Sequence, residues 1–185
     1  VGNNSSGSTS IYYGTTREKL LGLELVTADG ALRAIGAINS EGIRKIPKAV
    51  EKWIEKWSTA WSEKNLAKHF PDPSIHRRNT GYAIDLLGSS PDALLQVLCG
   101  SEGTLGVTTK IRLALEPLPP PQVAVVALHY RSMDDAMRAT PKLIRYKPYK
   151  LELMDRIILE CTRYSKEYSS YRDFIRGDPA AILLV

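Results

Sequence analysis

Two short segments of this chain combine glycine with small polar residues, a composition that lets a backbone approach a ligand closely. One runs from Gly100 to Thr108 with the sequence GSEGTLGVT, and the other runs from Gly2 to Ser8 with the sequence GNNSSGS. Glycine carries no Cβ that would block a ligand, and turns of this kind present backbone N–H groups to anions. Because the loops lie at the two ends of a long stretch of α/β pattern, they predict a site for a large, extended cofactor.

A third segment of chemical interest, His76 to Tyr82 (HRRNTGY), lies between the two loops in the sequence. An arginine in such a loop can bind a carboxylate through two parallel hydrogen bonds. Arg78 is therefore a candidate for substrate binding. For Arg77 and Arg78 alike, an ion pair within the protein or a solvated turn remains the alternative.

Other common catalytic and metal-binding patterns are absent from the sequence. His69, His76 and His129 have neither HExxH nor CxxC spacing around them, so no metal site is predicted. There is no GxSxG nucleophile elbow, no GxxxxGKS/T phosphate loop and no GxGxxG dinucleotide fingerprint. Cys99 lies in an apolar helix pattern and is expected to be a packed thiol. With Cys161 as the second of two cysteines, the chain fits a reducing compartment.

The elements expected to position the two loops are strands and one helix. Residues 21–28 predict a buried strand, Asp29-Gly30 a tight turn, and residues 31–37 a second strand that pairs back on the first. Residues 93–99 predict the helix that leads into the second glycine loop, and residues 105–115 predict the strand that follows it. The second loop therefore joins a helix to a strand.

A long amphipathic helix is predicted over residues 41–70, where apolar residues recur at spacings of three and four. Trp53, Trp57 and Trp61 form one stripe on this helix. We expect the stripe to pack against a sheet, and stacking on a base or a flavin ring remains the alternative.

The proline-rich segment 117–122 continues neither helix nor sheet and is the expected domain boundary. Beyond it the apolar pattern predicts alternating strands and helices in the order β-α-β-α-β, over residues 123–130, 133–145, 149–154, 156–168 and 180–185. The fold class expected from these elements is α+β.

The three chemical segments also carry a family resemblance. GNNSSGS followed by Tyr13-Gly14, then RNTGY at 78–82 and GSEGTLGVT at 100–108, resemble the FAD-linked oxidases of the vanillyl-alcohol-oxidase type in the same order. Within them the likeness is strongest to D-2-hydroxy-acid dehydrogenases: D-lactate dehydrogenase, the glycolate oxidase flavin subunit and D-2-hydroxyglutarate dehydrogenase. The resemblance implies an internal fragment with three parts. These are the larger part of a PCMH-type FAD-binding domain (1–116), a linker (117–122) and the beginning of an α/β cap, or substrate, domain (123–185).

The resemblance implies an FAD-dependent oxidoreductase that oxidises a D-2-hydroxy acid of the lactate, glycolate or 2-hydroxyglutarate class by hydride transfer to flavin. The first loop would lie along the diphosphate and ribityl part of FAD, and the second near its adenosine half. The implied cofactor-binding residues are Gly2, Asn3, Asn4, Ser5, Ser6, Gly7, Ser8, Ser101, Glu102, Gly103, Gly106, Val107 and Thr108, and the substrate candidates are Arg78, Asn79 and Tyr82. Catalytic groups are expected beyond residue 185, so the chain alone is predicted to be inactive.

The resemblance also implies an electron acceptor, which would be a quinone, an electron-transfer protein or an iron–sulfur partner. The segments at 139–141 and 177–179 resemble longer members that carry an iron–sulfur cluster in a further C-terminal domain. An oxidase of the same fold that acts on another alcohol or a sugar remains the alternative enzyme.

The net charge of +5 raises the non-enzyme alternative, a basic module that binds polyanions. The basic residues between 44 and 68 are interleaved with glutamates, however, which favours a solvated helix face and no nucleic-acid partner. No apolar run is long enough to span a membrane, and no signal peptide is visible in the residues given. We expect a cytoplasmic location, with peripheral association to a membrane complex as the alternative.

Overall fold

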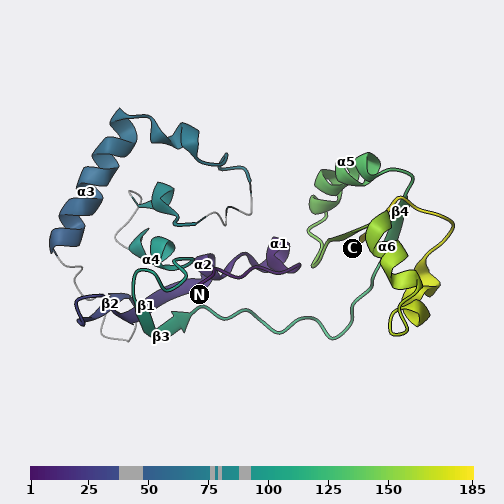
Figure 1. The fold of residues 1–185 in the computed structure, drawn as a ribbon, viewed down its shortest axis with the longest axis horizontal. Coiled ribbons are helices and arrows are strands. Elements are labelled where there is room, and N and C mark those ends of the chain that lie inside the picture. Colours follow the sequence, from purple (N-terminus) through teal and green to yellow (C-terminus); the bar gives the residue numbers. More distant parts are fainter. Residues whose placement is uncertain (38–47, 76–77, 79–80, 88–92) are drawn as a thin grey trace. The chain divides into compact units, whose positions relative to one another are not determined.

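The three-dimensional structure is a computed structural model of the 185-residue chain, and it describes residues 1–37, 48–75, 78, 81–87 and 93–185. The chain divides into two compact units, which are coloured by sequence in Figure 1. The first unit comprises Val1–Ser6 and Gly14–Glu116, and the second comprises Gly7–Tyr13 and Pro117–Val185. Each unit combines helices with an antiparallel sheet of three strands, so the predicted α+β class is confirmed.

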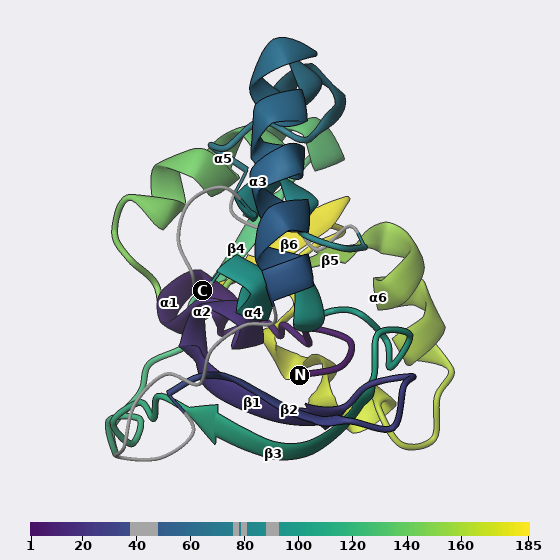
Figure 2. The ribbon, with the colours of Figure 1, turned by 90° about the vertical axis from the view of Figure 1, so that its left-hand side faces the viewer.

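The sheet of the first unit contains β1 (Leu20–Val26), β2 (Leu32–Gly36) and β3 (Val107–Leu113) in the order β2-β1-β3. The three strands lie side by side in Figure 2, and β1 is antiparallel to both neighbours. A tight turn joins β1 to β2, where Gly30 adopts φ +75°. A residue without Cβ adopts this left-handed backbone without strain, so the predicted hairpin forms.

Helix α4 (Ala93–Leu98) covers one face of this sheet. Its residues Leu95 and Leu98 share one apolar cluster with Leu23 and Ile35 of the hairpin. Burying a leucine side chain contributes roughly 1.5–3 kcal/mol, so this contact anchors the helix firmly. Because α4 ends where the second glycine loop begins, its packing on the hairpin also determines where that loop starts.

Helix α3 (Lys48–Glu63) carries the tryptophan stripe, and the expectation that the stripe packs on a sheet is wrong for the residues that the structure describes. Trp53 remains 48% exposed. The indole rings contact one another instead, with centroids 6.3 Å apart for Trp53 and Trp57 and 6.0 Å apart for Trp57 and Trp61. Trp57 Nε1 also donates a hydrogen bond of 2.9 Å to the carbonyl of Ile84. Helical spacing identifies the apolar face, but the tertiary arrangement decides which element covers it.

Shorter elements complete the first unit: α2 (Thr16–Lys19) and the 3-10 helices η1 (Leu66–His69) and η2 (Ile84–Leu86). The predicted helix over 41–70 is therefore divided between α3 and η1. Its first part, 41–47, lies outside the described residues.

The sheet of the second unit contains β4 (Ala127–Tyr130), β5 (Glu152–Asp155) and β6 (Ala181–Leu184). β6 lies between the other two strands and is antiparallel to both. Its residues Ala181 and Leu183 are almost fully buried, which explains the continuous apolar run at the end of the sequence.

Helices α1 (Ser10–Tyr13), α5 (Met133–Ile144), α6 (Arg156–Arg163) and the 3-10 helix η3 (Ser169–Phe174) belong to the same unit. Ser132 caps α5 by accepting a hydrogen bond of 3.1 Å from the Asp135 backbone N–H, and Asp155 caps α6 in the same way. Among the described residues, no helix is both long and apolar enough to cross a lipid bilayer.

Candidate functional site

The two glycine loops lie against each other in the first unit, although nearly the whole unit separates them in the sequence. Gly100 N–H donates to the Val1 carbonyl at 3.1 Å, and Glu102 N–H donates to the Gly2 carbonyl at 2.9 Å. The two bonds join the loops backbone to backbone. The structure therefore brings together most of the residues that the sequence singles out for a cofactor.

The second loop takes its shape from left-handed residues. Gly100 ends α4 at φ +92°, Glu102 follows at φ 53° and Gly103 at φ +75°. At Gly106 a Cβ would lie 2.8 Å from the Val26 carbonyl oxygen, so only glycine lets the chain enter β3 beside β1. Val107 and Thr108 then pair with the end of β1 and are exposed.

The first loop is anchored by Asn4, which is 3% exposed and adopts φ 49°, a conformation that asparagine tolerates better than most residues. Its Oδ1 accepts a hydrogen bond of 2.9 Å from the Arg17 backbone N–H. The neighbouring Ser5 carbonyl accepts one of 2.8 Å from the Thr16 hydroxyl. Asn4 thus has a structural role, and the side chains of Asn3 and Ser5 are exposed.

Gly2 to Ser6 belong to the first unit, whereas Gly7 and Ser8 belong to the second. There the Gly7 carbonyl accepts a hydrogen bond of 2.6 Å from the Ser10 hydroxyl. For the first unit, the candidate cofactor surface therefore comprises Gly2 to Ser6 together with the loop from Ser101 to Thr108.

The joined loops present an open backbone face. Gly2 and Gly103 are exposed, and a Cβ built on either residue would meet no atom within 4 Å. Within the described part of the chain, the Gly103 N–H donates to no protein acceptor. A backbone of this kind is suited to an anionic or planar ligand that approaches closely.

The third segment also adjoins the loops. The Tyr82 hydroxyl is hydrogen-bonded to the Thr104 hydroxyl, which in turn donates to the Ser101 carbonyl at 2.6 Å. Arg78 forms an ion pair with Asp85, with the two side chains 24% and 11% exposed. The ion-pair alternative for Arg78 is thus what the structure contains. Asn79 lies outside the described residues.

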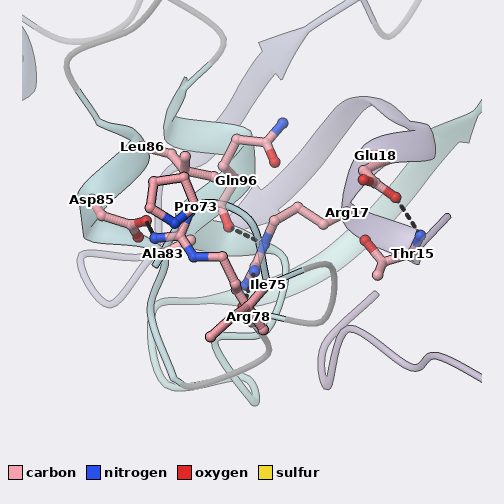
Figure 3. Close-up of a pocket in the computed structure, with 10 residues that line it drawn as sticks. All are labelled: Thr15, Arg17, Glu18, Pro73, Ile75, Arg78, Ala83, Asp85, Leu86 and Gln96. Carbon is pink, nitrogen blue, oxygen red and sulfur yellow. Dashed lines mark hydrogen bonds and ion pairs between the residues drawn. The ribbon is translucent and has the colours of Figure 1, made fainter. Parts of the chain in front are cut away.

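Arg78 and Asp85 line a cavity of about 250 Å³ in the first unit, drawn in Figure 3. Arg17, Glu18 and Gln96 line it from α2 and α4. The Nε atom of Arg78 is buried and has no hydrogen-bond partner among the described residues. The cavity is therefore lined by two arginines, Arg17 and Arg78, and by the carboxylate of Asp85, which is paired with Arg78.

Arg17 is buried next to Asn4 and Gly100, with 6% of its surface exposed. Burial lowers the pKa of Arg17, and the neighbouring Cys99 and Asp85 act in the opposite direction. Burial likewise raises the pKa of the Cys99 thiol, against the influence of the Arg17 charge. A thiol with this environment is a poor nucleophile, in agreement with its expected packing role.

Neither Arg17 nor Asp85 was predicted from the sequence to be part of this site. Arg17 stands in a short polar helix, TREK, where an arginine is ordinarily solvated. Asp85 follows the RNTGY segment closely, and that proximity was the one available signal. Among the described residues, no group of three or more histidine, cysteine, aspartate or glutamate side chains is placed to hold a metal ion.

Comparison with known proteins places this geometry in context. No protein-family model matches the chain. The chain is 27% identical over 185 residues to a D-2-hydroxyglutarate dehydrogenase of Pantoea ananatis, a match that covers 97% of this chain and 18% of that protein. The corresponding enzyme of Haemophilus influenzae is 25% identical over 187 residues, which cover 96% of this chain and 18% of that protein.

A D-lactate dehydrogenase of Archaeoglobus fulgidus is 26% identical over 186 residues, which cover 100% of this chain and 31% of that protein. The chain thus spans less than a third of the length of the curated relatives it matches. The similarities confirm the resemblance to D-2-hydroxy-acid dehydrogenases that the three segments carry. Each of these relatives is named as a dehydrogenase of D-2-hydroxyglutarate or D-lactate.

Proposed function

We propose that this chain forms part of an FAD-dependent oxidoreductase that oxidises a D-2-hydroxy acid of the lactate, glycolate or 2-hydroxyglutarate class. Residues 1–116 would supply the larger part of a PCMH-type FAD-binding domain, 117–122 a linker, and 123–185 the beginning of a cap domain. The observation that carries the proposal is the backbone pairing of the two glycine loops, Gly100 with Val1 and Glu102 with Gly2. The names of the relatives support the substrate class.

The joined loops fit the chemistry of FAD. Its diphosphate requires N–H donors on a backbone that it can approach closely, and its adenine requires a flat backbone surface. The open faces at Gly2 and Gly103 meet the first need, and the exposed start of β3 meets the second. Glu102, exposed beside them, would accept a hydrogen bond from a ribose hydroxyl. When bound, FAD supplies the acceptor for the hydride that the alcohol carbon loses.

The residues proposed to hold FAD are Gly2, Asn3, Asn4, Ser5, Ser6, Gly7, Ser8, Ser101, Glu102, Gly103, Gly106, Val107 and Thr108. Asn4 and Ser101 are buried and would act by shaping the loops. The exposed members would make the direct contacts.

Arg78 is proposed to bind a carboxylate of the substrate, and Asn79 and Tyr82 are the further substrate candidates. Its guanidinium faces the cavity and already carries a partner in Asp85. A substrate carboxylate would therefore compete with Asp85 or share the guanidinium with it, because an arginine fork has five N–H donors. The group that takes the hydroxyl proton is expected outside these 185 residues.

Electrons would leave the flavin to a quinone, an electron-transfer protein or an iron–sulfur cluster in a further domain. A cytoplasmic protein, either separate or bound peripherally to a membrane complex, suits each of these acceptors.

The proposal is tested by the visible absorption spectrum of the protein expressed from its complete gene, before and after anaerobic addition of D-lactate or D-2-hydroxyglutarate. A flavin spectrum that bleaches with a D-isomer and persists with the matching L-isomer is the expected result. A flavin that stays oxidised with every 2-hydroxy acid would contradict the substrate class and favour the alternative enzyme, an oxidase of the same fold that acts on another alcohol or a sugar. A protein that binds no FAD when the cofactor is added would contradict it.

A further inference from the structure

Arg17 lies at the point where the segments of the candidate site meet. It is a buried residue of α2, and its guanidinium lies behind the second glycine loop. A Cβ built on Gly100 would be 2.8 Å from Arg17 Nη2 and 3.4 Å from the Cβ of Asn4. The arginine therefore lies against Gly100 of the second loop and, through its backbone N–H, against Asn4 of the first.

The guanidinium makes three hydrogen bonds, one from each of its nitrogens and each to a backbone carbonyl. Nε donates to Gln96 at 2.9 Å and Nη2 donates to Cys99 at 2.7 Å, both at the end of α4. Nη1 donates to Arg78 at 3.4 Å, and in Figure 3 the Arg17 side chain extends between Gln96 and Arg78. With the backbone bond to Asn4, a single residue of α2 is bonded to the first loop, to the Arg78 carbonyl and to the end of α4, directly before the second loop.

The acceptors of Arg17 are carbonyls and not carboxylates. Among the described residues Arg17 forms no ion pair, and the nearby Asp85 is paired with Arg78. The last carbonyls of a helix carry partial negative charge, so the end of α4 compensates the buried cation. A buried cation of this kind is costly unless all these acceptors stay in place, which couples the positions of the loops to one another.

We propose that Arg17 is a positioning residue for the cofactor: its side chain and backbone hold the first glycine loop, the end of α4 that leads into the second, and the backbone of Arg78 at one fixed spacing. The inference rests on the proposed function. It assigns to Arg17 no contact with FAD or substrate. In this proposal, Gly2 and Gly103 can contact the same ligand only while α4, the first loop and residue 78 keep their present spacing. Arg17 is bonded to all three.

The fork geometry distinguishes arginine from lysine at this position. A lysine keeps the charge, but all its donors lie on one ammonium nitrogen. It cannot bond the carbonyls of Gln96, Cys99 and Arg78 at the same time, as the three nitrogens of the guanidinium do. Arg17→Lys should therefore keep the buried positive charge and lose one or more of the three hydrogen bonds to these carbonyls. Arg33→Lys is the matched control, because Arg33 lies in the β1–β2 hairpin of the same unit and pairs with the exposed Asp29.

The test uses the protein expressed from its complete gene, stripped of FAD and titrated with FAD while flavin fluorescence is followed. Arg17→Lys should raise the Kd for FAD by about tenfold or more, since at least one charged hydrogen bond from residue 17 to the end of α4 or to the Arg78 carbonyl is lost. Arg33→Lys should leave the Kd within about twofold of the wild type. Thermal unfolding of the FAD-free proteins reports separately on stability.

Chemical rescue separates positioning from general loss of stability. In Arg17→Ala, added ethylguanidinium at millimolar concentration should recover FAD affinity, whereas ethylammonium, which has the charge without the fork, should not. An unchanged Kd in Arg17→Lys, or equal rescue by both cations, would overturn the inference while leaving the proposed function intact. A wild-type protein that binds no FAD would instead overturn the proposed function itself, and the inference with it.

Discussion

Replacement of Gly100 by alanine is predicted to open the joined loops. An L-residue in the left-handed region costs roughly 1–2 kcal/mol, and Gly100 has φ +92°. The new Cβ would lie 2.8 Å from Arg17 Nη2, so the guanidinium must move and lose its bond to the Cys99 carbonyl. A hydrogen bond from a charged donor contributes roughly 1.5–3 kcal/mol, which brings the total to roughly 2.5–5 kcal/mol.

Gly103→Ala is the matched control in the same loop. Gly103 has φ +75°, so the backbone strain is similar, roughly 1–2 kcal/mol. Its Cβ would meet no atom within 4 Å, so no steric cost is added. The difference between the two variants therefore isolates the contact between Gly100 and Arg17.

The assay is the labelling rate of the Cys99 thiol, read by mass spectrometry of its peptide in the protein expressed from its complete gene. Cys99 is fully buried beside Gly100, so the reagent reaches it only when this segment opens. Gly100→Ala should accelerate labelling by roughly two to four orders of magnitude, and Gly103→Ala by at most about thirtyfold. Equal acceleration in the two variants would refute the view that Arg17 is held against Gly100.

Three further predictions concern charge, reactivity and the tryptophan stripe. The Thr27 hydroxyl lowers the pKa of Asp29 from 3.8 to about 2. The Asp29 carboxylate therefore contributes its full share of hairpin stability above pH 3.8, and this share is lost as the pH falls through about 2. NMR titration of the carboxyl carbon should give this pKa, and Asp29→Asn should abolish the pH dependence. Because burial raises the pKa of Cys99, iodoacetamide at mildly alkaline pH should label the exposed Cys161 and spare Cys99 until denaturant is added; comparable native rates would contradict this. Trp57→Phe removes the donor to η2 and should cost about 1 kcal/mol in urea unfolding, more than Trp53→Phe, which alters a half-exposed ring without that bond.

Local sequence signals predicted most of the first unit. The apolar run of 21–28 and the Asp-Gly turn after it predicted the hairpin with 31–37, because turn type depends on neighbouring residues. The apolar face of 93–98 and the glycine after it specified α4 and its end in the same way. The tryptophan stripe was misassigned, since periodicity identifies an apolar face without saying what covers it.

The candidate site likewise contains features that the sequence predicts and features that only the folded chain shows. The glycine loops were visible in the sequence because φ values and close approach restrict residue type locally, as at Gly106. Arg78 was visible as a chemical group, but its pairing with Asp85 required the folded chain.

By itself, the sequence determined the strands, the helix ends and the two loops, which depend on residues close together in the chain, and it carried the resemblance to hydroxy-acid dehydrogenases in the order of three separate segments. Only the tertiary structure decided that Val1 and Gly2 lie against Gly100 and Glu102, and that Arg17 joins them from behind. These contacts connect backbone carbonyls, which every residue carries. No residue type in the sequence therefore marks them, and only the packing of α4 on the hairpin brings the partners within reach.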